Sequence, residues 1–392
     1  MRLVNWTAGL LVLGLVLPAA GAIRKEGRFW IEEKEGAIPA GTRLRVASVG
    51  PVSITGDTGN DVRFKVTRRV RADTQREAER WFEDAPLTAS LQNGTTVISL
   101  QSPRCGRCGF SASLAVSAPR RTHHTTIDSE GGSLTAQGLE GRLNASTQGG
   151  AILIEDIGRS VRADTAGGNI TLRAIGGEIL CDTAGGAISL DGAGADATLT
   201  TSGGSITARN VAGTLRTETA GGSITAEKVG RSLVAETSGG SINVTDVAGR
   251  VRAETAGGSV NILSAPHGVR AETAGGKIYL RDVAGAVTAS NATGSIQAYF
   301  LRGGLLQDSV LETNVGSIDV WLPADLKVTI EAIVELTNND RRIQSDFEAI
   351  RVRLDRERFG PSSITAEGAL NGGGPVLRIL NTAGHIKIHR LE

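Results

Sequence analysis

The sequence predicts an all-β fold: a parallel β-solenoid of about nine to ten 18-residue coils with an irregular β cap at each end. A Gly-Gly pair returns once in every repeat, without insertion or deletion. Between the pairs, apolar residues alternate with polar ones, as in half-buried strands. Two short strands cannot bury their own apolar face, so successive repeats must stack. The pairs begin at Gly131, Gly149, Gly167, Gly185, Gly203, Gly221, Gly239, Gly257 and Gly275, and Thr293-Gly294 keeps a tenth register.

The positions within one repeat indicate which side chains form the core. With the first glycine as position 1, position 4 is always aliphatic, and positions 6, 9 and 13 are mostly aliphatic. Position 15 is usually Ala and position 17 usually Thr. These small residues predict a thin cross-section. We expect the Gly-Gly pair to supply the positive φ of a tight corner.

The spacing also separates types of solenoid. The apolar positions do not fall at six-residue intervals, which argues against a hexapeptide-repeat β-helix. A calcium-binding β-roll needs Gly-Gly-x-Gly-x-Asp, whereas this repeat reads Gly-Gly-Ser-Ile-Thr-Ala, without Asp at the ligand position. A parallel solenoid without calcium is therefore the expected architecture.

The chain begins with the features of a secretory signal peptide over residues 1–22. Arg2 is followed by an apolar run from Leu10 to Leu17 and by small residues ending in Ala20-Gly21-Ala22. The alternative is an uncleaved membrane anchor, although the run is short for a permanent span. We expect the mature protein to be exported, to the periplasm or to the cell surface.

Three further segments follow. Residues 23–130 are expected to form an N-terminal β cap with a short helix at 74–82, where Thr74 and Glu77 form a capping box. Residues 131–298 form the solenoid repeats. Residues 299–392 form the C-terminal solenoid end and a second β cap. Caps are expected because an open solenoid end exposes an unpaired strand edge.

Cys105 and Cys108 stand in Pro-Arg-Cys-Gly-Arg-Cys-Gly. An exported chain permits a disulfide, so we expect a structural bond between them or two free thiols. A zinc site would need two further ligands at matching spacing, and a redox role would need a helix start. Cys181 occupies position 15 and is expected to be a small buried residue.

Two outward surfaces repeat along the predicted strands. Positions 14 and 16 carry opposite charges, which we expect to form a solvated, mutually screened face rather than a ligand site. Positions 3 and 5 carry mostly hydroxyl side chains, for example Ser205 and Thr207, expected as ordinary exposed strand residues. The charged residues are Arg162, Arg216, Arg252 and Arg270 at position 14, and Asp164, Asp182, Glu218, Glu236, Glu254 and Glu272 at position 16.

Signs of catalysis are sparse. Aromatic residues make up 3% of the chain, and the coils leave no room for long cleft-forming loops before Tyr299. The histidines are scattered: His123-His124 and His267 are expected at the surface, and His385 and His389 share a strand face. The net charge of +1 disfavours nucleic acid, and the Arg68, Arg69 and Arg71 cluster fits an edge strand protected by charge. We expect no catalytic residue, cofactor or metal.

Three stretches carry a family resemblance: the Gly-Gly-Ser-Ile-Thr-Ala strands, the exit Gly316-Ser317-Ile318-Asp319-Val320-Trp321-Leu322-Pro323, and the tail from Leu370-Asn371-Gly372-Gly373-Gly374-Pro375 to Ile388. Together the chain resembles the bacterial adhesin-like β-strand-repeat family, a domain family of unknown function, and is similar to the autotransporter adhesin head domain. The resemblance covers nearly all of the mature chain. It implies a β-helical, exported, envelope-associated protein, and it implies no catalytic residues.

The sequence therefore predicts a non-enzymatic exported β-solenoid, an adhesin or a structural or interaction protein of the cell envelope. Its partner would be an envelope protein or a glycan. One alternative is a carbohydrate-active β-helix enzyme, a lyase or hydrolase, with a site near residues 299–360. Another is a periplasmic accessory or sensor module that binds its partner through a cap.

Overall fold

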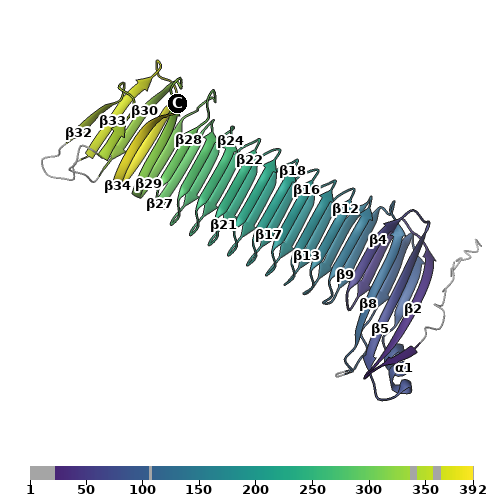
Figure 1. Cartoon of the computed structure of the whole chain (residues 1–392). Coiled ribbons are helices and arrows are strands. Elements are labelled where there is room, and N and C mark those ends of the chain that lie inside the picture. The colour runs from purple at the N-terminus through teal and green to yellow at the C-terminus, as the bar shows by residue number, and fades with distance from the viewer. Residues whose placement is uncertain (1–22, 106–107, 336–341, 356–362, 392) are drawn as a thin grey trace, which may run out of the picture. The chain divides into compact units, whose positions relative to one another are not determined.

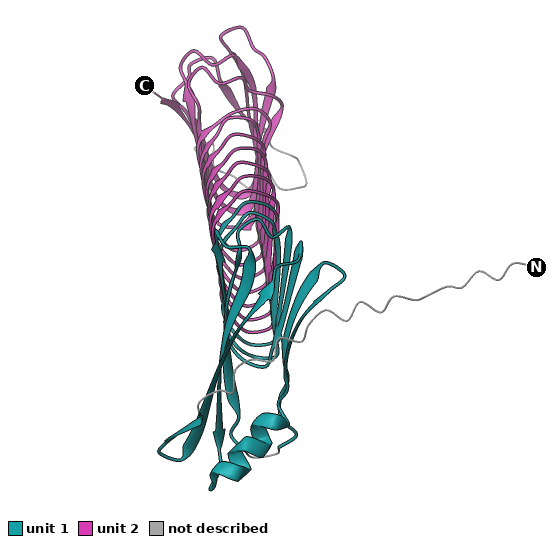
Figure 2. Cartoon of the chain, turned by 90° about the vertical axis from the view of Figure 1, so that its right-hand side faces the viewer, with its two compact units in different colours: residues 1–159 teal, residues 160–392 magenta. Residues whose placement is uncertain are grey.

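The computed structural model describes residues 23–105, 108–335, 342–355 and 363–391, in two compact units, residues 1–159 and 160–392 (Figures 1 and 2). The predicted signal peptide at 1–22 lies outside the described residues. The all-β prediction is confirmed: the described residues form 34 strands and one short helix. No helix among them is both long enough and apolar enough to cross a membrane.

Unit 1 contains two series of neighbouring strands. One series runs β1-β2-β5-β8-β4-β10-β12, with antiparallel pairing up to β8 and parallel pairing after it. The other runs β6-β7-β3-β9-β11, and only its first pair is antiparallel. The elements are β1 Ile23–Glu26, β2 Phe29–Pro39, β3 Arg43–Ser48, β4 Val52–Asp57, β5 Asp61–Arg71, α1 Gln75–Glu83, β6 Leu87–Gln92, β7 Thr95–Leu100, β8 Ser111–Pro119, β9 His124–Ser129, β10 Leu134–Leu139, β11 Arg142–Thr147 and β12 Ile152–Ile157.

The predicted helix is present as α1, and Thr74 is its N-cap. The Thr74 side chain accepts a hydrogen bond from the backbone N–H of Glu77, as expected. The Glu77 carboxylate, however, accepts from the backbone N–H of Asp73, one residue before the N-cap position that a capping box uses. Phe82 and Ala78 are buried and pack with Val70 and Cys108 in a small apolar cluster.

Arg68 corrects the prediction of a charged edge strand. Strand β5 is paired on both sides, by β2 and β8, and Arg68 is only 2% exposed. Its guanidinium forms an ion pair with Glu32 and donates to the carbonyl oxygens of Phe82 and Ala85, just at and after the C-terminal end of α1. Arg68 therefore ties the helix to the sheet. Of the three arginines in this cluster, Arg69 and Arg71 are exposed and Arg68 is buried.

Unit 2 repeats two strands in every coil. The strands pair in parallel with partners one repeat away along the chain, for example Ile206 with Ile188 and Ile224. Figure 1 shows them as a regular row, and this register is consistent with a β-solenoid. The strands are β13 Val161–Thr165, β14 Ile170–Ile175, β15 Ile179–Thr183, β16 Ile188–Ala193, β17 Ala197–Thr201, β18 Ile206–Val211, β19 Leu215–Thr219, β20 Ile224–Val229, β21 Leu233–Thr237, β22 Ile242–Val247, β23 Val251–Thr255, β24 Val260–Ala265, β25 Val269–Thr273, β26 Ile278–Val283, β27 Val287–Thr293, β28 Ile296–Phe300, β29 Ser309–Pro323, β30 Val328–Val334, β31 Ile343–Ser345, β32 Arg351–Asp355, β33 Ser363–Leu370 and β34 Val376–Leu391.

The core of unit 2 lies at the predicted positions. In one coil Ile206, Ala208, Val211 and Leu215 are at most 1% exposed. The buried hydroxyl of position 17 has a role that the sequence analysis did not assign. Thr219 donates to the carbonyl oxygen of Gly204 at 2.8 Å and accepts from the backbone N–H of Gly222 at 3.2 Å.

The expectation that the Gly-Gly pairs have positive φ is wrong. None of the nine predicted pairs has positive φ; that conformation occurs at position 8, for example at Asn210 and Lys228, both with φ 56°. The second glycine is required for a different reason: a Cβ on Gly222 would overlap the carbonyl oxygen of Gly204 in the preceding coil. A Cβ on Gly221 would meet nothing nearer than 3.6 Å. The close approach of the backbones of successive coils therefore requires glycine at the second position of the pair.

Beyond the repeats, the single long strand β29 takes the place of both strands of a coil. β29 pairs with β27 and β28, and β34 then pairs with β29 along most of its length. On its other side β34 pairs in parallel with β30 and β31. The strands β30, β33 and β32 pair antiparallel. The stretch from Tyr299 to Val310 begins in β28 and ends in β29.

Candidate binding pocket

Unit 1 contains a cationic pocket at the starts of three parallel strands. Its volume is about 660 Å³. Four arginines and two histidines line it, against a single glutamate, so that even with neutral histidines three positive charges remain uncompensated. The lining residues are Thr42, Arg43, Arg121, His123, His124, Glu140, Gly141, Arg142 and Arg159.

Strand register places three of these residues in one row. Arg43, His124 and Arg142 are the first residues of β3, β9 and β11, and His124 lies directly opposite both arginines. Neighbouring strands are about 4.8 Å apart, so the row spans about 10 Å. The backbone holds this arrangement: the N–H of His123 donates to the carbonyl of Thr42, and the N–H of Arg142 donates to the carbonyl of His123, both at 2.9 Å.

The His124 imidazole lies in the middle of the row. Its Nε2 atom is buried and has no hydrogen-bond partner among the described residues. Burial, together with the nearby charges of Arg43 and Arg142, lowers the pKa of His124 below its ordinary value. A buried nitrogen without a hydrogen-bond partner costs free energy.

The arginines of the pocket lack carboxylate partners. None of Arg43, Arg121, Arg142 and Arg159 forms an ion pair with another described residue. Arginines just outside the pocket do: Arg45 lies 3.7 Å from Asp128, and Arg120 lies 3.0 Å from Asp156. Arg43 and Arg142 carry like charges two strands apart, about 10 Å from each other, with His124 between them. The row is therefore suited to an anion.

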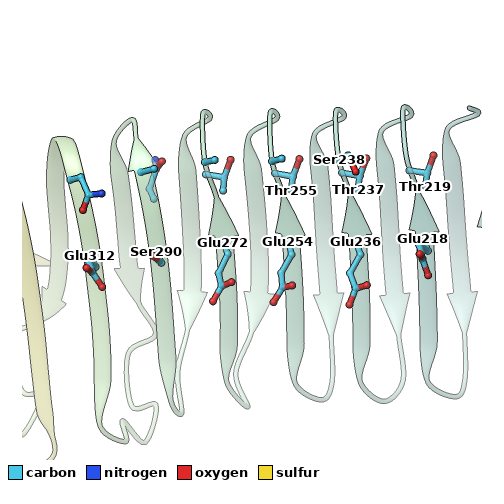
Figure 3. A pocket seen from close by; sticks show the side chains of 16 residues that line it. Glu218, Thr219, Glu236, Thr237, Ser238, Glu254, Thr255, Glu272, Ser290 and Glu312 are labelled. Atoms are coloured by element: carbon cyan, nitrogen blue, oxygen red, sulfur yellow. The ribbon is translucent and has the colours of Figure 1, made fainter. Parts of the chain in front are cut away.

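The charged columns predicted in unit 2 are internally paired. Figure 3 shows Glu218, Glu236, Glu254 and Glu272 pointing the same way from the corresponding strands of successive coils, in a groove of about 640 Å³ that also reaches Glu312. Arginines beside them bridge neighbouring carboxylates, as Arg216 contacts Glu218 at 3.6 Å and Glu236 at 3.5 Å. The further contacts are Arg252 with Glu236 and Glu254, Arg270 with Glu254 and Glu272, and Arg162 with Asp164. Exposed pairs of this kind contribute little stability each and leave little free charge for a ligand.

The hydroxyl oxygens of the outward serines already accept hydrogen bonds from the backbone. The hydroxyl oxygen of Ser205 accepts the backbone N–H of Ser223 at 3.3 Å, and that of Ser223 accepts the N–H of Ser241 at 3.2 Å. The same bond joins Ser259 to Ser241. These side chains therefore help to hold successive coils together. Thr207 and Thr225 lie opposite each other on paired strands and are half-buried.

The sequence analysis missed an aromatic row at the C-terminal end of unit 2. The rings of Tyr299 and Trp321 stack at 4.0 Å with an angle of 6°, and Trp321 stacks on His389 at 4.8 Å. Tyr279 packs at a tilt on Tyr299. Because Tyr299, Trp321 and His389 stack face to face, the row stabilises the strand stack and leaves few of their ring faces open to a sugar.

The histidines of unit 2 do not form a metal centre. His389 lies 3.9 Å from Asp319 and 3.5 Å from Asp346, near the region that the sequence indicates for the alternative enzyme site. His385 lies on the same strand, paired opposite Ser317, and His267 stands in the turn before β25. Across the described ranges, no group of three or more His, Cys, Asp or Glu residues could hold a metal ion.

Cys105 and Cys108 lie in unit 1, and Cys181 lies in unit 2. The structure joins Cys105 to Cys108, whose Cα atoms are 5.6 Å apart, beside the apolar cluster of α1. Cys181 is a buried free thiol in the core of unit 2. Burial strongly raises the pKa of Cys181, so its thiolate form is rare.

Comparison with known proteins gives structural matches only. No model of a protein family matches the chain, and no curated protein matches it. It is similar to a "putative adhesin" from Parabacteroides distasonis (12% identity, 74% of this chain and 96% of that one, TM-score 0.27). Others are a "putative adhesin" from Bacteroides fragilis (10%, 92% and 97%, TM-score 0.21) and a "putative cell adhesion protein" from Clostridium sporogenes (7%, 91% and 98%, TM-score 0.17). Their descriptions name the class that the sequence resemblance indicated, but TM-scores this low carry no conclusion about this chain.

Proposed function

We propose that the protein is a non-enzymatic, exported, adhesin-like binding protein that holds an anionic partner in the cationic pocket of unit 1. The observation that carries this proposal is the in-register row of Arg43, His124 and Arg142. Two arginines of like charge are kept on either side of His124, and neither forms an ion pair with a carboxylate of the described residues. A charge arrangement that opposes folding is explained if it serves binding.

A glycan is the partner that best fits an adhesin-like role. Acidic polysaccharides carry repeated negative groups, and a pocket of this volume is in the range that accommodates a small ligand or one or two sugar residues. Acidic proteins and nucleic acids carry negative groups as well, so they belong in the test as competing partners.

Two features support a role without catalysis. Asp319 and Asp346 both contact His389, and the Glu column of unit 2 is bridged by arginines. A glycoside hydrolase needs two carboxylates free to act on the scissile bond. The alternative of a carbohydrate-active enzyme predicts turnover of a polysaccharide and loss of turnover on mutation of Asp319 or Asp346.

The remaining proposals concern export and end protection. Residues 1–22 act as a cleaved signal peptide, and residues 23–130 and 299–392 protect the two ends of a stack of about nine to ten coils. N-terminal sequencing of the secreted protein should find Ile23 as its first residue. Protease treatment of intact cells, with a periplasmic protein as control, should digest the protein if it acts as a surface adhesin. Protection until the envelope is opened would place its partner in the periplasm.

The binding test uses the mature chain and immobilised polymers. A neutral polysaccharide, a polyuronate, a phosphorylated polysaccharide, single-stranded DNA and an acidic protein are compared at equal ligand density. We expect retention on an acidic polysaccharide, weakening with salt, and none on the neutral one. Release of oligosaccharides from any column would favour the enzyme, and tighter retention on DNA or on the acidic protein would contradict the glycan proposal.

A further inference from the structure

We propose that the group recognised in the cationic pocket is a dianionic phosphate monoester carried on a sugar, a proposal that rests on the proposed function and names its ligand class. The pocket offers four guanidinium groups, two from strand starts and two from turns, and two imidazoles, and the ligand must match these donors. The number of charges, the number of acceptor oxygens and the size of the pocket each bear on the choice.

Charge favours phosphate over carboxylate. The lining residues carry three uncompensated positive charges when both histidines are neutral. A carboxylate supplies one negative charge, whereas a phosphate monoester supplies about 1.5 to 2 at neutral pH. Of the common acidic groups on sugars, the monoester therefore neutralises the largest share of the row.

Donor geometry points the same way. Arg43 and Arg142 lie in register on either side of His124, at the starts of three neighbouring strands. A planar carboxylate has two oxygens, and one bidentate arginine satisfies both of them. A phosphate monoester has three terminal oxygens, so it can accept from Arg43 and from Arg142 at the same time.

Size indicates that the phosphate is part of a larger molecule. A volume of about 660 Å³ is far more than one phosphate fills, and the lining includes two uncharged residues, the exposed Thr42 and the buried Gly141. A phosphorylated monosaccharide uses both parts of the site: the phosphate lies against the row and the sugar beside Thr42.

The test is calorimetric titration of the mature chain with glucose 6-phosphate, glucuronic acid, glucose and inorganic phosphate. The sugar phosphate should bind at least tenfold more tightly than glucuronic acid, with no heat from glucose, and inorganic phosphate should bind more weakly because the ring contacts are missing. Arg43→Gln and Arg142→Gln should each weaken sugar phosphate binding about tenfold. Arg45→Gln is the matched control, because Arg45 lies on the same strand as Arg43 but pairs with Asp128; it should change nothing.

The outcomes separate the two proposals. Equal or tighter binding of glucuronic acid would overturn the phosphate assignment and leave the anionic pocket standing. Inorganic phosphate as tight as the sugar phosphate would overturn the assignment to a sugar. If neither glucose 6-phosphate nor glucuronic acid binds, and the acidic polysaccharides are not retained on the column, both proposals fail. If the Arg43→Gln and Arg142→Gln variants bind the sugar phosphate as tightly as the wild type, the ligand binds elsewhere, and the assignment to this pocket is overturned. Thermal melting of each variant confirms that a loss of binding is not a loss of fold.

Discussion

The buried hydroxyl of Thr219 donates to the carbonyl oxygen of Gly204 in its own coil and accepts the N–H of Gly222 in the next. One side chain thus satisfies two backbone groups in adjacent coils. The bond to the carbonyl of the second glycine of the pair before it recurs at Thr183, Thr201, Thr237, Thr255 and Thr273. At Asn291 an amide nitrogen takes the place of the hydroxyl, at 2.6 Å from the carbonyl oxygen of Gly276.

Replacing Thr219 with Val should destabilise the protein by about 1 to 3 kcal/mol, because Gly204 O and Gly222 N lose a partner in the interior. Thr207→Val is the control, since Thr207 is half-buried on the outer face and its loss should stay within about 0.5 kcal/mol. Urea denaturation monitored by circular dichroism measures both. Equal losses would show that the buried hydroxyl has no special role.

The two glycines of one pair should respond in opposite directions. Gly222→Ala forces a Cβ against the carbonyl of Gly204 and should cost about 2 kcal/mol or more. Gly221→Ala meets no close contact and has no positive φ, so it should be neutral or stabilise by up to about 1 kcal/mol. The same unfolding measurement compares the two variants. A destabilising Gly221→Ala combined with a harmless Gly222→Ala would contradict the stacking explanation.

The cysteines should resist alkylation in the folded protein. We predict that Cys105 and Cys108 are bonded to each other, so iodoacetamide modifies neither without a reductant. Cys181 should stay unmodified as well, because burial raises its pKa and blocks access. Mass spectrometry should find no adduct on the native protein, one after denaturation and three after denaturation with reductant. An adduct on native Cys105 or Cys108 would show free thiols.

The pKa of His124 should rise when a neighbouring charge is removed. Arg43 and Arg142 add to the effect of burial in disfavouring the imidazolium, so Arg43→Gln should move the pKa back toward 6.5. Glu140, Arg121, Arg159 and His123 also line the pocket and are retained. Proton NMR titration of the imidazole measures the shift, with Arg45→Gln as control and His124→Gln to assign the signal. An unchanged pKa would show that the row is not electrostatically coupled.

The sign of the pH dependence follows from the same shift. The folded pKa of His124 lies below the unfolded value, so the unfolded chain binds more protons as the pH falls through about 6.5. His124 therefore lowers the stability of the free protein in acid and does not affect it well above that pH. An anion in the pocket opposes this loss by favouring the protonated form.

The repeat phase made much of unit 2 predictable. Positions 4, 6, 9, 13, 15 and 17 are apolar or Thr in the sequence, except for Asn291 at position 17, and the structure buries them, as in Leu215, Thr217 and Thr219. The reason for the glycines was not predictable from one repeat, because the clash that excludes a Cβ from Gly222 comes from the preceding coil. Arg68 was misplaced because its partners, Glu32 and the helix carbonyls, lie far from it in sequence.

The cationic pocket was only partly visible in the sequence. His124 and Arg142 are one repeat length apart, so extending the repeat phase one coil before Gly131 would have placed them side by side. Arg43 lies outside any repeat, and only the pairing of β3 with β9 brings it beside His124. The aromatic row escaped notice for a similar reason: Tyr299, Trp321 and His389 come together through β28, β29 and β34, beyond the regular coils.

The most direct test of the binding proposal compares two variants on one immobilised acidic polysaccharide, the one that retains the wild-type chain. The Arg43→Gln/Arg142→Gln protein, shown to be folded by its melting curve, should pass through at a salt concentration that holds the wild type. The Arg45→Gln protein should be held like the wild type. If the double variant is retained as strongly as the other two proteins, the cationic pocket is not the binding site.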